Sequence, residues 1–315
     1  GNLKGFDIGI PDDIAASLEC HEFLEMESVR PLIKTRGRCG HKGNYGHCLI
    51  VAGATGKTGA ASLAANSAVR AGSGLVTLAV PASLNPVLEV KTTEAMTLPL
   101  DDAGKGFLGT GSSDQILCVL QGKDAIAVGP GISRESETVS LVRRLVKDAA
   151  LPMVVDADGL NAVAEDASIL HEKRSPALIL TPHPGEMSRL SGLSISAIEG
   201  DRISAARNFS IRYGVFLVLK GASTVIATPG GEIAVNGSGN PGMGSGGMGD
   251  VLTGIIVSLL GQNYLPFEAC RLGVFLHGFA ADLVAREKGE IGISATDVQE
   301  MLPFAYNAIL QSYLK

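Results

Sequence analysis

The sequence predicts an α/β fold in which helices cover both faces of a mostly parallel central sheet, a doubly wound arrangement of three layers. Short aliphatic and β-branched runs alternate with helical patterns, and a polar or glycine-rich cluster follows each run. Continuous apolar runs of this kind are typical of strands buried on both faces of a parallel sheet. The predicted parallel strands comprise residues 48–52, 75–80, 125–128, 153–155, 177–180 and 215–219.

The remaining elements follow from local patterns. Residues 224–228 and 232–235 flank a Pro-Gly-Gly turn, which predicts an antiparallel hairpin at one edge of the sheet. Alanine-rich residues 60–71 predict a helix, and a mostly apolar helix is expected from Val251. Because no linker-like tract divides residues 40–315, we expect one domain there, preceded by a helical or irregular segment over roughly residues 12–38.

Composition and charge exclude several classes of protein. The 315 residues are 45% hydrophobic and 18% charged, which excludes intrinsic disorder, and the 40 glycines follow no collagen-like period. The net charge of −6 and the lack of a basic stretch argue against a nucleic acid partner. The longest apolar run, residues 251–260, is interrupted and too short for a membrane span. Five scattered cysteines without a CxxC spacing predict reduced thiols and a cytoplasmic protein.

The strongest chemical signal is a glycine-rich segment that opens the helix near Val251. This segment and the other polar or glycine-rich clusters each follow a predicted strand. We therefore expect them together at the carboxyl edge of the sheet, where open α/β sheets bind ligands. The backbone N–H groups of this segment can form an anion hole beside a favourable helix dipole, and they belong to Gly246, Gly247, Met248 and Gly249. Asp250 can then take a proton from a substrate hydroxyl. The alternative is a flexible loop with Asp250 as a favourable first-turn residue.

A second signal lies at the end of the last parallel strand, where Lys220 and Gly221 follow residues 215–219. A lysine at this position can neutralise a phosphate, and the glycine permits close approach of a nucleotide. A solvated lysine at a strand end explains the pattern equally well.

Two further glycine clusters have more than one interpretation. Gly129-Pro-Gly131 allows backbone contact with a ligand, although a plain turn would have the same composition. Gly56-Lys57-Thr58 resembles the end of a P-loop, but that motif requires glycine at position 51, which is Val51. We therefore interpret the 53–60 segment as a small-residue loop that makes room for a bulky ligand.

Acidic side chains follow two other strands. In Thr181-Pro-His183-Pro-Gly-Glu186, rigid backbone places an imidazole and a carboxylate at the rim of the expected cleft. Glu186 either holds Mg²⁺ through water or serves only as a helix-starting residue. Asp156, with Asp158 and Asn161, follows the 153–155 strand and could order Mg²⁺ waters, bind a ribose or cap the next helix.

Together these motifs resemble the ADP/ATP-dependent NAD(P)H-hydrate dehydratases, over about residues 30–315. The resemblance is carried, in chain order, by residues 41–46, the 53–60 loop with residues 70–76, and the motifs at 129–131, 156–161, 181–186, 220–221 and 247–250. It implies a ribokinase-like fold, in agreement with the α/β prediction. Residues 6–11 resemble the tail of an NAD(P)H-hydrate epimerase domain. The resemblance thus implies that residues 1–30 are this tail and a connecting segment, and that residues 31–315 are the dehydratase domain of a bifunctional chain.

The resemblance also implies a reaction and its participants. The family repairs the S epimers of hydrated NADH and NADPH, termed NADHX and NADPHX, by phosphorylating the hydrate hydroxyl and eliminating phosphate. ADP is favoured over ATP as the phosphoryl donor, Mg²⁺ accompanies the nucleotide, and assembly into tetramers or larger oligomers is expected. By motif match, the hydrate would contact Ala60, Gly131, His183 and Asp250. The nucleotide would contact Lys220, Gly221, Ala222, Ser223, Thr224 and Gly249.

Two other functions remain open from the sequence. One is a ribokinase-like kinase for a vitamin precursor or sugar, with the same base and a phosphoester product. Such kinases commonly carry Asn-x-x-Glu where this chain has His183-x-x-Glu186, which favours the dehydratase. The other is a nucleotide sensor without turnover, and the acid retained at Asp250 argues against it.

Overall fold

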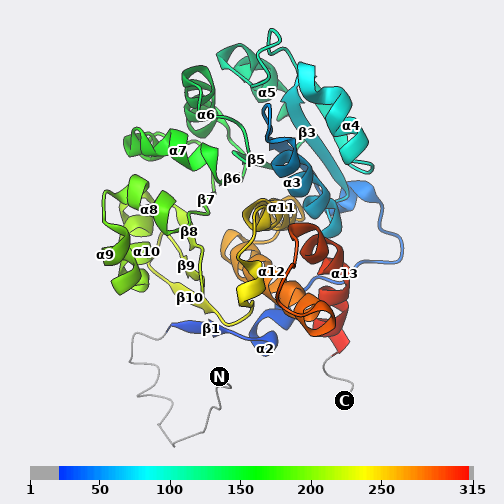
Figure 1. Ribbon diagram of the computed structural model, residues 1–315, viewed down its shortest axis with the longest axis vertical. Coiled ribbons are helices and arrows are strands. Elements are labelled where there is room, and N and C mark those ends of the chain that lie inside the picture. The colour runs from blue at the N-terminus through cyan, green and yellow to red at the C-terminus, as the bar shows by residue number, and fades with distance from the viewer. Residues whose placement is uncertain (1–20, 312–315) are drawn as a thin grey trace, which may run out of the picture.

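The computed structural model describes residues 21–311, which form a ten-stranded sheet with helices on both faces (Figure 1). The strand order is β1-β10-β9-β8-β7-β6-β5-β2-β3-β4, and within this sheet β9 alone runs against its neighbours. The strands are β1 (Glu22–Leu24), β2 (His47–Val51), β3 (Leu75–Pro81), β4 (Met96–Leu100), β5 (Ala125–Val128), β6 (Met153–Val155), β7 (Leu178–Leu180), β8 (Phe216–Leu219), β9 (Val225–Ala227) and β10 (Ile233–Asn236).

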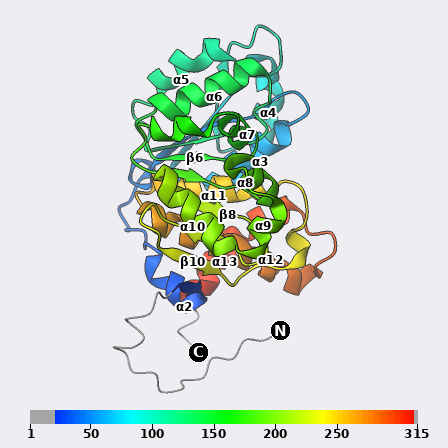
Figure 2. The same cartoon turned by 90° about the vertical axis from the view of Figure 1, so that its left-hand side faces the viewer.

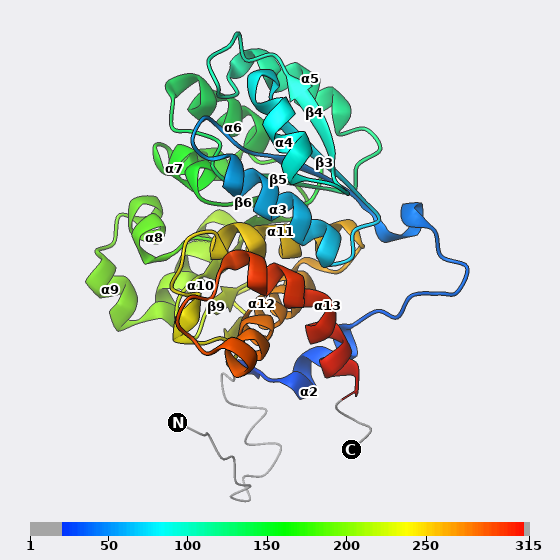
Figure 3. The same ribbon diagram turned by 45° about the vertical axis from the view of Figure 1, so that its right-hand side comes forward.

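The helices form one layer on each face of the sheet. Figure 3 shows one layer in front, with α3 (Thr58–Arg70), α4 (Asn85–Lys91), α11 (Met248–Gly261), α12 (Pro266–Lys288) and α13 (Ala295–Gln311). Figure 2 shows the opposite layer, with α5 (Ser113–Val119), α6 (Ser136–Asp148), α7 (Asp158–Ala164), α8 (Pro184–Ser191), α9 (Ile195–Gly200) and α10 (Arg202–Tyr213). The short α2 (Met26–Val29) contacts α12. Six 3₁₀ turns complete the described chain, at Arg30–Leu32, Lys42–Tyr45, Ala82–Leu84, Thr110–Ser112, Ala167–His171 and Pro241–Met243.

Alternation along the central strands explains why both faces are covered. In β5, Ala127 belongs to the core on the α11 side, whereas Ile126 and Val128 belong to the core on the α6 side. All four residues of β5 are buried. Successive side chains of a strand point to opposite faces, so an unbroken apolar run needs an apolar partner on each side.

Most of the predicted architecture is confirmed. Each predicted parallel strand is present, and β9 and β10 form the expected antiparallel hairpin. The sequence analysis did not identify β4, which carries a proline and is partly exposed. It also did not identify β1, which lies within the segment expected to be helical or irregular and pairs in parallel with β10. Residues 22–29 thus pack against this domain, and the position where a preceding domain ends stays a prediction.

Among residues 21–311, no helix is both long enough and apolar enough to cross a membrane.

Helices α3 and α11 pack with their backbones nearly in contact. A Cβ added to Gly254 would lie 2.2 Å from the Ala64 carbonyl oxygen and 3.0 Å from the Ala68 nitrogen. Such backbone atoms cannot move aside without shifting a whole helix. Glycine at 254 therefore sets how closely the two helices approach.

We expect Gly254→Ala to destabilise the protein by about 1–3 kcal/mol, because over-packing forces the two helices apart. Urea unfolding followed by circular dichroism measures this loss. Gly200→Ala is the matched control, since a Cβ on that helical glycine would meet nothing within 4 Å. Equal stability of Gly254→Ala and the wild type would contradict the close contact.

Candidate active site

A cavity of about 820 Å³ lies at the carboxyl ends of β6 and β8 and is bounded by the first turn of α11. This is the edge of the sheet where ligands bind in open α/β folds. Its lining brings together groups that are far apart in the sequence, including His183, the whole segment Lys220–Thr224, and Asp250. The clusters that follow β6, β7 and β8 therefore meet the start of α11 at one cavity, whereas the predicted clusters at 53–60 and 129–131 are not among its lining residues.

The glycine-rich segment begins α11 as expected. Gly247 is the N-cap residue with a φ of 92°, and the helix starts at Met248 with Asp250 in its first turn. A Cβ at Gly247 would lie 2.6 Å from Leu63 Cδ1, so both the backbone angle and the packing require glycine. Gly247, Met248 and Gly249 line the cavity at this helix N-terminus, whereas the exposed Gly246 is not among the lining residues. The first-turn amides are placed where an anion can approach them.

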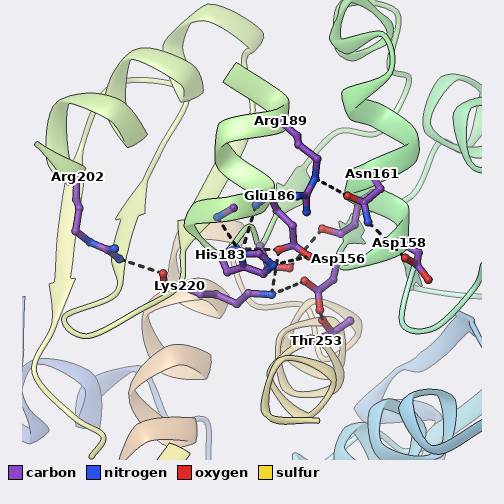
Figure 4. Close-up of polar contacts among 12 residues, drawn as sticks. Asp156, Asp158, Asn161, His183, Glu186, Arg189, Arg202, Lys220 and Thr253 are labelled. Carbon is purple, nitrogen blue, oxygen red and sulfur yellow. Dashed lines mark hydrogen bonds and ion pairs between the residues drawn. The ribbon is translucent and has the colours of Figure 1, made fainter. Parts of the chain in front are cut away.

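A buried ion pair lies directly beneath this turn (Figure 4). The Lys220 ammonium donates to Asp156 Oδ1 at 2.7 Å, and the hydroxyl of Thr253 donates to Asp156 Oδ2 at 2.8 Å. Asp156 is 1% exposed and Thr253 is fully buried. A Cβ on Gly249 would lie 3.3 Å from Lys220 Nζ, so this glycine lets the helix start approach the ammonium group. Thr253 was missed by the sequence analysis, although it lies three residues after Asp250 on the same helix face.

His183 and Glu186 form a reciprocal cap at the start of α8. The backbone N–H of His183 donates to Glu186 Oε2 at 2.8 Å, and the Gly185 N–H donates to His183 Nδ1 at 3.0 Å. Because Nδ1 accepts this bond, the neutral imidazole carries its proton on Nε2. Burial, and next the charge of Lys220, lower the pKa of His183 and favour that neutral form. His183 lines the cavity, while Glu186 is buried behind it, with Oε2 at 3.7 Å from Lys220 Nζ.

The electrostatics of the site favour a proton acceptor at Asp250. Burial, and next the negative charge of Asp156, raise the pKa of Asp250 to about 7. Burial also raises the pKa of Glu186. Burial alone would lower the pKa of Lys220, but the nearby Asp156 and Glu186 carboxylates raise it above its usual value. Near neutral pH, Asp250 can therefore exchange a proton while Lys220 stays charged.

The segment Lys220–Thr224 forms part of the wall of the cavity, and we call it the nucleotide loop after the contact predicted for it from the sequence. Its backbone is in the left-handed region at Gly221, with a φ of 144°, and at Ser223, with a φ of 53°. The Thr224 hydroxyl donates to the Gly221 carbonyl at 3.0 Å. This compact turn places Lys220 at the cavity.

A second part of the wall consists of residues 236–241, which adjoin the nucleotide loop, since the Asn236 N–H donates to the Thr224 carbonyl at 2.9 Å. These residues are anchored to α12, and the sequence analysis assigned them no ligand contact. The Ser238 hydroxyl donates to the Phe275 carbonyl, and the Gly239 N–H donates to Asp282, both at 2.9 Å. His277 of α12 also lines the cavity, and the sequence analysis assigned it no ligand contact. Burial, and next the charge of Lys220, lower the pKa of His277 to about 4, so this wall adds a neutral imidazole.

Ala60 and Gly131 lie beside one another and are not among the residues that line the cavity. A Cβ on Gly131 would lie 3.1 Å from Ala60 Cβ and 2.8 Å from Lys57 Cβ. Lys57 also bridges to the α7 start through an ion pair of 2.7 Å with Asp158. The structure thus joins the two predicted hydrate contacts to each other, and their contact with the hydrate stays a prediction.

The described residues contain no cluster of three or more His, Cys, Asp or Glu side chains arranged to hold a metal ion. Both oxygens of Asp156 are engaged by Lys220 and Thr253, so this carboxylate is an ion-pair partner in the structure. Glu186 accepts the N–H of His183 and faces Lys220 at a longer distance. Asp156 lines the cavity and Glu186 does not, so any contact of either carboxylate with Mg²⁺ would be indirect, through water, and stays a prediction.

Comparison with solved structures defines the class as a ribokinase-like α/β fold. The crystal structure of the ADP/ATP-dependent NAD(P)H-hydrate dehydratase from Bacillus subtilis, co-crystallised with ATP and Mg²⁺, is 30% identical in sequence. It covers 92% of this chain and 99% of its own, with a TM-score of 0.81. Ribokinase from Arabidopsis thaliana is 14% identical and covers 83% of this chain and 98% of its own, with a TM-score of 0.55, a likeness of fold alone.

Residues 48–304 match the family described as NAD(P)H-hydrate dehydratase, and the chain belongs to this family. The bifunctional NAD(P)H-hydrate repair enzyme of Moorella thermoacetica is 45% identical over 305 residues, which are 96% of this chain and 57% of that protein. The corresponding Escherichia coli enzyme is 35% identical over 299 residues, 95% of this chain and 55% of its own length. The chain thus spans slightly more than half the length of these relatives.

The raised pKa of Asp250 predicts a pH-dependent cost in stability. The folded state favours protonated Asp250. The stability of the protein is therefore unaffected by this group below its unfolded pKa near 4, and it falls as the pH rises from there to the folded pKa of about 7. Asp250→Asn, which mimics the protonated form, should therefore be more stable than the wild type by up to about 4 kcal/mol at pH 8, and nearly equal at pH 4.

Thermal unfolding of both proteins between pH 4 and pH 8 measures this difference. Asp114→Asn is the control, since Asp114 is an exposed partner of Arg144. A stability difference that does not grow with pH would contradict the buried, perturbed carboxylate.

Proposed function

We propose that this chain dehydrates the S epimers of NADHX and NADPHX to NADH and NADPH at the expense of ADP. The observation that carries the proposal is the shared cavity, in which Asp250, a glycine-rich helix start, the nucleotide loop and His183 meet. Membership of the dehydratase family and the likeness to the Bacillus subtilis enzyme support the same reaction.

In the proposed reaction, Asp250 accepts the proton of the hydrate hydroxyl. Its pKa of about 7 suits this role, because a base near the working pH is deprotonated in a useful fraction of molecules yet still binds a proton. The amides of Gly247, Met248 and Gly249 stabilise the negative charge that develops beside it. Lys220 adds a fixed positive charge, held in place by Asp156.

When bound, the nucleotide supplies its terminal phosphoryl group and Mg²⁺ offsets its charge. Hydroxide is a poor leaving group, whereas phosphate departs readily from the hydrate ring. The ring nitrogen lone pair assists the cleavage of the C–O bond, and loss of a neighbouring ring proton restores the dihydronicotinamide. The cavity of about 820 Å³ has room for a nucleotide beside the nucleotide loop.

The finer properties belong to the same proposal. The Bacillus subtilis structure was co-crystallised with ATP and Mg²⁺, and we favour ADP on the resemblance of the motifs to bacterial members of the family. We also propose a tetramer or larger oligomer and fusion to an epimerase domain in the full-length protein, which the bifunctional relatives support. A cytoplasmic location is supported by the free thiols of Cys39, Cys48, Cys118 and Cys270.

With ADP and Mg²⁺, the protein should regenerate absorbance at 340 nm from NADHX, and Asp250→Asn should lower kcat/KM at least about 100-fold. Wild-type kcat/KM should rise with pH up to about 7 and then level, because only the carboxylate form of Asp250 accepts the proton. Asp114→Asn is the matched control. Turnover unaffected by Asp250→Asn would refute the assigned base, and a stable phosphoester product would support a kinase instead.

Lys220→Met should weaken ADP binding at least about tenfold and hydrate binding much less, because the ammonium of Lys220 reaches the cavity from the nucleotide loop. Titration calorimetry with each ligand measures both affinities, and a melting curve confirms that the variant is folded. Lys147→Met, which removes an exposed lysine paired with Glu172, is the control. Equal losses for ADP and hydrate would contradict the separation of the two binding regions.

A further inference from the structure

The nucleotide loop adopts a conformation that its own residues do not explain. Ser223 is in the left-handed region, which costs free energy for a residue with a Cβ. Within the loop, one side-chain hydrogen bond, from Thr224 to Gly221, is present, and the Lys220 N–H donates to the Pro182 carbonyl at 2.8 Å. The peptide groups that join β8 to the loop must be held by groups from elsewhere in the fold.

Arg202, the first residue of α10, contacts these peptide groups (Figure 4). Its Nη2 donates to the Leu219 carbonyl at 2.9 Å and to the Lys220 carbonyl at 3.1 Å. Its Nη1 donates to Glu199 Oε1 at 2.8 Å, which fixes the guanidinium from the other side. The rigid, planar donor set of arginine suits such a bridge, whereas a lysine ammonium has no comparable geometry.

The guanidinium also lies against Gly221. A Cβ on Gly221 would be 2.9 Å from Arg202 Nη2 and 3.0 Å from Nη1. Glycine is therefore required at 221 both for its φ of 144° and for this contact. The side chain of Arg202 is 15% exposed and is not among the residues that line the cavity, so it does not meet a ligand there.

We propose that Arg202 is a positioning residue for nucleotide binding, which holds the carbonyls of Leu219 and Lys220 and so fixes the loop that presents Lys220 to the phosphates. This inference rests on the proposed function, since it takes residues 220–224 as the nucleotide contacts. Arg202 contributes affinity for the adenine nucleotide through the loop, without contact with the nucleotide or the hydrate.

The test compares Arg202→Lys and Arg202→Gln with the wild type, using ADP as the titrant in calorimetry and the 340 nm assay for kinetics. Both variants should raise the Kd and KM for ADP about tenfold, or about 1.4 kcal/mol, while KM for NADHX and kcat at saturating ADP change less than about threefold. Arg202→Lys keeps the charge, so an effect in this variant reports the lost geometry. Glu199→Gln, which keeps both carbonyl bonds, should have a smaller effect.

Arg143→Lys is the matched control, since Arg143 lies on α6 and pairs with Asp166 at 2.7 Å. Melting temperatures show whether a variant is folded, and Arg202→Lys provides the milder change if Arg202→Gln is not. Unchanged ADP affinity in folded Arg202→Lys, or equal losses of affinity for ADP and for NADHX, would overturn this inference and leave the proposed function standing. A wild-type protein that neither binds ADP nor turns over NADHX would overturn the proposed function itself.

Discussion

The buried ion pair between Lys220 and Asp156 organises the site. It joins the ends of β6 and β8, and through Thr253 it also fixes the first turns of α11. Removing two charges from water is costly, and such a pair is tolerated only when further hydrogen bonds satisfy its remaining atoms. The Thr253 hydroxyl provides one of these bonds. The pair therefore serves to place a cation under the start of a helix rather than to stabilise the fold.

The charge on Asp250 depends on this arrangement. Burial, and next the charge of Asp156, make ionised Asp250 unfavourable, while Lys220 offsets part of that effect, and the balance raises the pKa of Asp250 to about 7. A carboxylate in ordinary surroundings would be fully ionised at that pH and would hold a proton poorly. The site thus accepts a local loss of stability in return for a usable base, which is a common relation between stability and function in enzymes.

The sequence predicted what depends on local patterns, and it missed what depends on contacts across the fold. Apolar runs identified the parallel strands, and glycine spacing located the start of α11. β4 and β1 were missed because they are partly exposed and lack a continuous apolar pattern. The partner of Lys220 is 64 residues away in the chain, and no local signal connects the two. His277 and Arg202 were missed for the same reason, since only the sheet order brings α12 and α10 to the cavity edge.

Helix packing connects Ala60, a predicted hydrate contact, to the start of α11. Ala60 lies in the first turn of α3, and Asp250 lies in the first turn of α11. Gly254 lets these two helices approach until the Ala64 carbonyl nearly meets its Cα, and Gly247 packs against Leu63. Because protein interiors are close-packed, a shift of either helix would move its first turn relative to the other. The proposed transfer reaction needs Asp250 at the boundary between two ligands, and the α3–α11 contact holds Asp250 at a constant position relative to the small-residue loop.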